Sequence, residues 1–73
     1  MSMKIKSVKD VRPGDVIPMG SLYAAMGEEP DAYTEALAIK VQIVERDGYY
    51  RIFTDEDGNT YWLQRSTAVH VEE

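Results

Sequence analysis

One short acidic segment has the residue types of a calcium site. Residues 55–59 read Asp-Glu-Asp-Gly-Asn, and carboxylate and amide oxygens are the ligands that Ca²⁺ prefers. A helix-loop-helix calcium loop spreads its ligands over about twelve residues and ends in a bidentate glutamate. Counted from Asp55, that last position is Ser66, so the spacing fails. Because Asp-Gly is a strong signal for a hairpin turn, the segment is predicted to be a hairpin tip. No metal or other cofactor is expected.

Catalytic chemistry has few candidate residues in this chain. His70 is the only histidine, and there is no cysteine. A nucleophile needs an adjacent base that a third group orients, and an expected turn separates Ser66 and Thr67 from His70. A pair of carboxylates for acid–base catalysis needs only proximity in the fold, so that possibility stays open. A barrel of this length leaves little room for a ligand pocket of roughly 300 Å³ or more, and the protein is therefore expected not to be an enzyme.

The aromatic residues are the better candidates for function. Tyr23 and Tyr33 lie in an irregular segment, whereas Tyr49 and Trp62 are expected on the outward faces of two strands. Tyrosine and tryptophan are enriched at the hot spots of protein interfaces. These four residues are the predicted interaction site, with Tyr49 and Trp62 as neighbours on one sheet face and a loop tyrosine over them. The alternative is that the loop packs back and the rings form a second small core, which so short a domain would need.

The second half of the chain has the alternation of a β-meander. Four runs of alternating or apolar residues are predicted to be strands: 37–45, 49–54, 60–64 and 68–71. Asp47-Gly48 and Asp57-Gly58 are predicted to form tight turns, and residues 64–67 a single 3₁₀ turn. Strand alternation puts two sets of apolar residues on one face each, namely Leu37, Ile39, Val41 and Ile43 in the first strand and Val69 and Val71 in the last. His70 falls on the outward side.

The first half of the chain is less regular. Residues 5–11 are predicted to be a short strand, and residues 12–15 a turn in which proline presets φ and glycine admits a positive φ. Residues 21–26 are predicted to form one or two helical turns, capped by Ser21 and ended by Gly27. Residues 32–36 fit either a short helix or the start of the next strand. The whole segment 19–35 is too long for an ordinary hairpin connection, and loops of that length tend to be functional or mobile.

Composition narrows the classes of function. Residues 1–73 make one small domain, and the net charge of −5 disfavours nucleic acid as a partner. Basic residues gather near the N-terminus, where lysines are expected to protect a strand edge. No apolar run approaches the roughly 18 residues of a membrane span, and no apolar core of a signal peptide follows the N-terminus. A cytoplasmic protein without a membrane contact is therefore expected.

The order of these elements resembles the SH3-like small β-barrel. A strand follows a Pro-Gly-Asp turn, and then come a long loop, three strands with tight turns, a one-turn connector and a last strand. The resemblance implies an all-β, five-stranded SH3-like barrel whose long first loop contains one or two helical turns. The sequence V-x-P-G-D-V-I at 11–17, with D-G-x-T-x-x-L at 57–63 and V-x-V-E at 69–72, is also similar to that of small uncharacterised bacterial and phage proteins. The A-L-Y-D-Y motif of eukaryotic SH3 domains is missing, so binding of proline-rich peptides is not implied.

These observations predict a non-catalytic protein-interaction module. It would be a free-standing accessory protein of bacterial or phage type that binds a protein partner, or itself, through the loop 18–35 and the Tyr49/Trp62 face. Two alternatives stay open. A nucleic-acid-associated small barrel would need a basic groove beside the rings, for which Lys40, Arg46, Arg51 and Arg65 are available. An acidic inhibitor of a host factor would need a contiguous patch of carboxylates.

Overall fold

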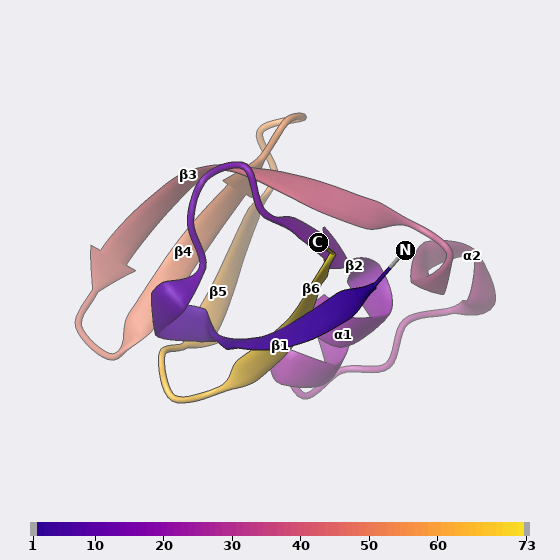
Figure 1. Ribbon diagram of the computed structural model, residues 1–73, viewed down its shortest axis with the longest axis horizontal. Helices are drawn as coiled ribbons and strands as arrows, with labels where there is room; N and C mark the ends of the chain where they lie inside the picture. Colours follow the sequence, from indigo (N-terminus) through magenta and orange to yellow (C-terminus); the bar gives the residue numbers. More distant parts are fainter. Residues whose placement is uncertain (1, 73) are drawn as a thin grey trace.

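The computed structural model describes residues 2–72, which fold into antiparallel β-sheet with two short helices (Figure 1). In chain order the elements are β1 (Met3–Ser7), the 3₁₀ turn η1 (Val8–Asp10), β2 (Val16–Pro18), α1 (Met19–Ala25), α2 (Ala32–Glu35), β3 (Ala38–Asp47), β4 (Tyr50–Asp55), β5 (Thr60–Gln64) and β6 (Ala68–Glu72). The all-β prediction is confirmed. The described residues form six strands rather than the predicted five, because β1 adds an N-terminal strand beside β6. None of their helices is long and apolar enough to cross a membrane.

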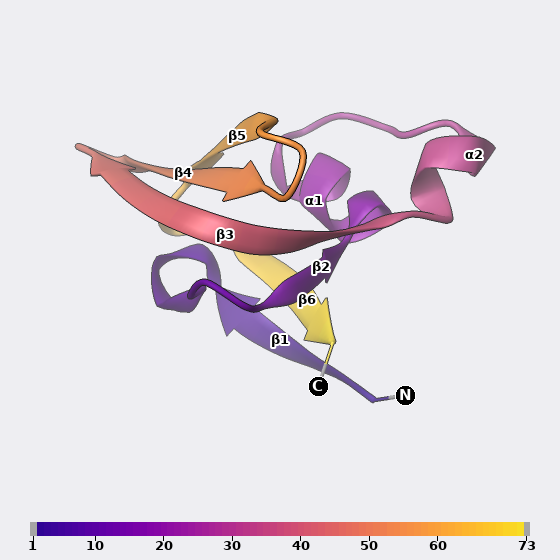
Figure 2. The same cartoon turned by 90° about the horizontal axis from the view of Figure 1, so that it is seen from above.

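Strand β3 joins the two halves of the sheet, whose strand order is β1-β6-β2-β3-β4-β5. Its first residues pair with β2 and its later residues with β4. Figure 2 shows β1, β6 and β2 on one side of β3, and β4, β5 and α1 on the other. Apolar side chains from both halves, from η1 and from α1 form the core: Val8, Val11, Ile17, Met19, Leu22, Ile39, Val41, Phe53, Leu63, Val69 and Val71. Val69 and Val71 thus face inward as predicted.

A bulge in β3 changes which side chains face the core. The register moves from Val41 opposite Asp55 to Ile43 opposite Thr54, so one extra residue lies between them. Val41 is buried, but Ile43 is 51% exposed and Val44 packs against the core instead. The prediction that Leu37, Ile39, Val41 and Ile43 share one face of a strand was therefore wrong at both ends, since Leu37 precedes the strand and is also exposed. One extra residue moves every later side chain to the other face.

The N-terminal segment also differs from its prediction. In place of a strand over residues 5–11, β1 ends at Ser7 and η1 turns the chain. The backbone N–H of Val8 donates to the carbonyl of Thr67 at 2.8 Å, and the Val8 side chain is fully buried. Ile5 is 69% exposed, whereas Val11 is buried. The 3₁₀ turn breaks the alternation, so positions before and after it no longer follow one period.

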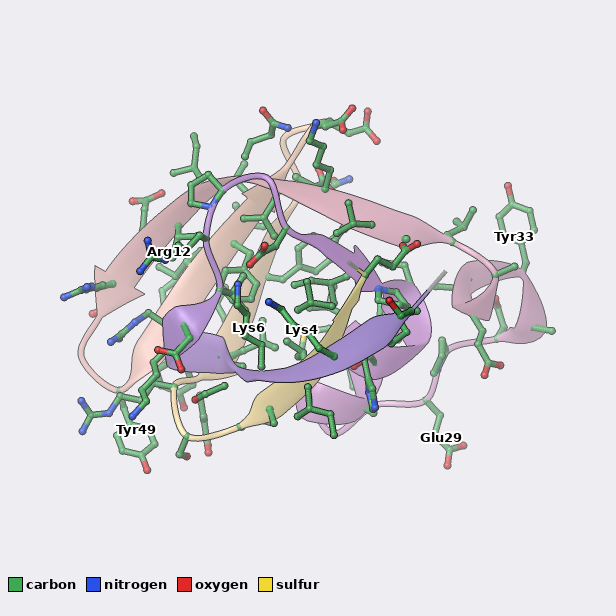
Figure 3. The ribbon with its side chains drawn as sticks, in the orientation of Figure 1. Lys4, Lys6, Arg12, Glu29, Tyr33 and Tyr49 are labelled. Atoms are coloured by element: carbon green, nitrogen blue, oxygen red, sulfur yellow. The ribbon has the colours of Figure 1, made fainter. Side chains whose placement is uncertain are left out.

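The two lysines of β1 lie on the core side of the sheet. Lys4 is opposite Val71 and Lys6 is opposite Val69 in the β1–β6 register, and both valines are buried. Figure 3 shows the side chains of both lysines extending from β1 toward the segment that connects η1 to β2. The Lys6 ammonium donates to Asp15 Oδ2 at 2.8 Å. Burial alone would raise the pKa of Asp15. The hydrogen bonds from Lys6 and from the Arg12 backbone outweigh that effect, so the pKa of Asp15 lies below its ordinary value.

The predicted turns form where glycine admits a positive φ. Asp15 N–H donates to the carbonyl of Arg12 at 3.1 Å, and Gly14 has φ of 97° at the third position, as a type II turn requires. Asp15 Oδ2 also accepts from the backbone N–H of Arg12 at 2.9 Å. Gly48 and Gly58 have φ of 58° and 84° in the two hairpin turns. Thr67 N–H closes the connector 64–67 on the carbonyl of Gln64.

The helices lie in the long segment between β2 and β3, as predicted. Helix α1 spans Met19–Ala25 and stops before Gly27, and the predicted choice at residues 32–36 is resolved as helix α2. The prediction that Ser21 caps α1 was wrong. Because the helix begins directly after Pro18, Ser21 lies inside it, and its hydroxyl accepts from the backbone N–H of His70 in β6 at 2.8 Å.

Candidate functional site

One exposed aromatic pair lies on the outer side of the sheet. Trp62, in β5, is 50% exposed, and Tyr50, in β4, is 41% exposed. Their ring centroids are 6.1 Å apart with an interplanar angle of 64°, which is an edge-to-face contact. Tyr49 lies in the β3–β4 turn rather than, as predicted, in the strand, because Gly48 and Tyr49 are the two turn residues between Asp47 and Tyr50. Trp62 therefore meets Tyr50.

The pair belongs to a larger apolar surface. Directly opposite residues in an antiparallel sheet share a face, and Ile52 is opposite both Trp62 in β5 and Glu45 in β3. Thr54 is opposite Ile43, which the bulge has turned outward. We call Ile43, Tyr50, Ile52 and Trp62 the aromatic face. These apolar side chains, with the exposed Glu45 beside Ile52, fit a protein interface, where charge is depleted at the centre and kept at the edge.

A groove adjoins the aromatic face at the end of β5. It has a volume of about 390 Å³ and lies between the C-terminal end of α1 and the strand. Its lining consists of Ala25, Met26, Gly27, Tyr50, Trp62, Leu63 and Gln64. Met26 is half-buried against the core, and its flexible thioether can adapt to the shape of a bound side chain. Gly27, with φ of 78°, ends the helix and leaves this wall of the groove without a side chain.

The three tyrosines that were predicted to join Trp62 lie away from the aromatic face. Tyr23 is half-buried against the core, so the alternative of a second packing role applies to this residue. Tyr33 is 79% exposed on α2, and Figure 3 shows it at the opposite end of the molecule from Tyr49. The hydroxyl of Tyr49 lies 3.4 Å from Ser66 Oγ, and the Arg65 guanidinium lies 5.3 Å from the centre of its ring. The four predicted rings therefore do not form one site.

A buried carboxylate holds the hairpin that carries Trp62. Asp55 Oδ1 accepts from the backbone N–H groups of Asp57 at 2.9 Å and Asn59 at 3.0 Å, and Oδ2 accepts from the Tyr61 hydroxyl at 2.8 Å. Burial opposes the charge of Asp55, but these bonds outweigh it, so its pKa lies below the ordinary value. Burial, followed by the bond to Asp55, raises the pKa of Tyr61 to about 12.

This arrangement confirms the predicted hairpin tip, and the Asp55 carboxylate serves the hairpin itself. Each of its oxygens accepts from the same short segment of chain, which fixes the course of residues 55–61. Within residues 2–72, no group of three or more His, Asp or Glu side chains is placed to hold a metal ion. The tip therefore positions β5.

The one histidine has a partner that sequence spacing could not reveal. Ser21 Oγ lies 3.5 Å from His70 Nδ1, at the limit of a hydrogen bond, in addition to its shorter bond with the His70 backbone. A hollow of about 610 Å³ lies beside them, between α1, β6 and Glu35, and exceeds the room expected for this fold. A nucleophilic serine needs a base in close contact. The shorter bond, from the His70 backbone N–H to Ser21 Oγ, instead connects α1 to β6.

Comparison of the chain with models of known protein families, with curated proteins and with solved structures gives no match. Tyr50, which sequence reasoning missed, had one usable signal. Glycine at the first position of a two-residue hairpin turn is typical of type II′, and it would have put Tyr49 in the turn and Tyr50 in the strand.

Proposed function

We propose that the protein is a non-catalytic protein-interaction module that binds its partner through the aromatic face and the adjoining groove. The observation that carries this proposal is the Trp62–Tyr50 pair, two large rings half exposed on a sheet face. Rings of this kind bury a large area at a small entropic cost, so they are the usual anchors of protein interfaces. The groove beside Met26 offers such an interface a pocket at its margin.

We also propose that the fold is an SH3-like barrel to which β1 adds a strand. The order of β2 to β6 supports this proposal. A strand follows the turn 12–15, a long segment with helical turns comes next, and three strands with tight turns lead through a connector to the last strand. In such a barrel the long segment and the β3–β4–β5 face lie beside each other, as α1 and β5 do around the groove.

Substitution of Trp62 by alanine tests the proposed function. Because the side chain is half exposed, we expect the free energy of unfolding to fall by less than about 2 kcal/mol, against about 3–5 kcal/mol for a buried tryptophan. Tyr33→Ala is the matched control, since Tyr33 is exposed away from the aromatic face. A protein that the immobilised wild type and Tyr33→Ala retain from a cell extract, and that Trp62→Ala loses, supports the proposal. A large loss of stability in Trp62→Ala, or equal retention by all three, contradicts it.

A second candidate function, nucleic-acid binding, is favoured by one observation. A hollow of about 490 Å³ is lined by Ser7, Lys9, Tyr49, Arg65 and Ser66, which combines two cations, two serine hydroxyls and a tyrosine ring. Phosphate groups are commonly bound by such cations and hydroxyls, and bases stack on such rings. Titration with single-stranded DNA and RNA at low salt tests this candidate. Absence of binding there removes it.

A further inference from the structure

The two edges of the sheet differ in how they are protected. The described strands end in β1 on one side and β5 on the other. Lys4 and Lys6 point from β1 to the core side, which is a common protection against pairing with another sheet. Strand β5 reads Thr-Tyr-Trp-Leu-Gln, with no charge and no proline, and its register with β4 is continuous. Figure 2 shows β5 at the outer margin of the molecule. A neutral edge of this kind is a template for strand pairing.

The backbone of Trp62 faces this open edge. Hydrogen bonds join Asp55 N–H to the Asn59 carbonyl at 3.0 Å and Arg65 N–H to the Tyr49 carbonyl at 2.9 Å, so bonded pairs stand at both ends of the β4–β5 ladder. Bonded and non-bonded pairs alternate in an antiparallel ladder. Tyr61 and Leu63 therefore bond to β4, and the N–H and C=O groups of Trp62 are directed outward at the middle of the strand.

The two ends of β5 carry opposite charges. The hairpin tip before the strand has the exposed carboxylates of Glu56 and Asp57. The turn after the strand has the exposed Arg65, with Lys9 lining the same hollow. A strand that pairs with β5 is therefore attracted most strongly if its own acidic end lies beside Arg65 and its own basic end lies beside the hairpin tip.

We propose that the partner at this edge is a second copy of the chain, with its β5 antiparallel to the first across a twofold axis at Trp62. The proposal rests on the proposed function, because it names a partner for the same surface. In this register Trp62 faces Trp62 of the second copy and Thr60 faces Gln64, so the whole strand is paired. Arg65 then lies opposite Asn59 of the second copy, beside its acidic hairpin tip, and the twofold axis repeats this contact.

The chain itself carries the charge pattern that the β5 edge favours in a partner strand. Residues 56–65 read acid, neutral aromatic strand and base in that order, so an antiparallel pair brings unlike charges together at both ends. A parallel pair would bring like charges together, which disfavours it. Antiparallel pairing also continues the sheet through both molecules. The two aromatic faces then join, which gives an external partner a doubled surface and the gain in apparent affinity that follows from two linked sites.

Sedimentation equilibrium of the full chain tests the pairing. We expect a monomer–dimer equilibrium for the wild type and a dissociation constant about tenfold larger for Arg65→Glu. The reason is that the two contacts per dimer between residue 65 and the acidic hairpin tip change from attraction to repulsion. Arg12→Glu has the same change in charge away from β5 and is expected to dimerise as the wild type does. A triple variant, Arg65→Glu with Glu56→Arg and Asp57→Arg, also reverses the charge of the hairpin tip and is expected to restore the dimer.

The outcomes separate this proposal from the proposed function. A wild type that stays monomeric at all concentrations overturns the pairing, as does a dimer that Arg65→Glu leaves unchanged or that the triple variant fails to restore. None of these results affects capture of a partner by the aromatic face, which the Trp62→Ala and Tyr33→Ala comparison measures. Trp62 is the only tryptophan, so a blue shift of its emission with increasing concentration is the expected signature of pairing at this strand.

Discussion

Removal of the Tyr61 hydroxyl isolates one bond of the hairpin that positions the candidate site. The hydroxyl donates to Asp55 Oδ2 at 2.8 Å, and Asp55 is only 7% exposed. A hydrogen bond to a charged group contributes about 1.5–3 kcal/mol. In Tyr61→Phe the carboxylate keeps its backbone donors, so we expect a loss near the lower end, about 1.5–2 kcal/mol at pH 7. Urea unfolding followed by circular dichroism measures the change in free energy.

The same bond makes a prediction about pH. The pKa of Asp55 is below its ordinary value of 3.8, so its contribution to stability is present above that pH and is lost as the pH falls through the lower folded value. The pKa of Tyr61 is raised from 10.0 to about 12, so its contribution is present below pH 10.0 and is lost as the pH rises toward 12. The stability difference between wild type and Tyr61→Phe should therefore be largest between these limits and narrow at both extremes.

Tyr33→Phe is the control for this experiment, because it removes the same hydroxyl from a side chain that is 79% exposed. We expect it to leave the free energy of unfolding unchanged within about 0.5 kcal/mol. The reasoning is refuted if Tyr61→Phe is equally neutral. It is also refuted if the difference in free energy of unfolding between Tyr61→Phe and wild type stays constant from about pH 6 to about pH 2, the range that spans the ordinary titration of a carboxyl group.

Two further substitutions test how the chain positions β5 and β6. Ser21→Ala leaves the backbone N–H of His70 without its acceptor at 2.8 Å, and we expect thermal unfolding to show a loss of about 1–2 kcal/mol. A variant as stable as the wild type would show that water replaces the hydroxyl. Gly58→Ala forces a Cβ onto a residue with φ of 84°, and we expect a loss of about 1–2 kcal/mol in urea unfolding although nothing crowds the site. An unchanged midpoint would contradict that conformational cost.

The turns were predictable from the sequence because their chemistry is local. Pro13-Gly14 in the first turn, Gly48 in the second and Asp57-Gly58 in the third each supply the φ values that their turn needs, whatever the rest of the chain does. These turns gave the order of strands from β2 to β6. They did not predict that the strand expected at residues 5–11 ends at Ser7, since the break at Val8 depends on its burial and on its bond to Thr67, far away in the sequence.

The faces of the strands were harder to predict because they depend on pairing. The bulge between Val41 and Ile43 follows no local signal, and Gln42 is an ordinary strand residue. Its effect is nevertheless large, because it turns Ile43 outward and adds an apolar side chain to the aromatic face. Trp62 was correctly predicted to be outward. Tyr50 was missed, since its place depends on the turn beginning at Gly48.

The candidate site and the stability of the hairpin meet in one strand. Successive side chains of β5 alternate, so Tyr61 and Leu63 face the core while Trp62 faces outward. The bonds of Asp55 then determine where Trp62 points, because they fix the chain immediately before it. A rigid strand loses little entropy when another chain binds along it. A neutral edge fixed in this way, with an acid at one end and a base at the other, has the properties that a specific pairing surface requires.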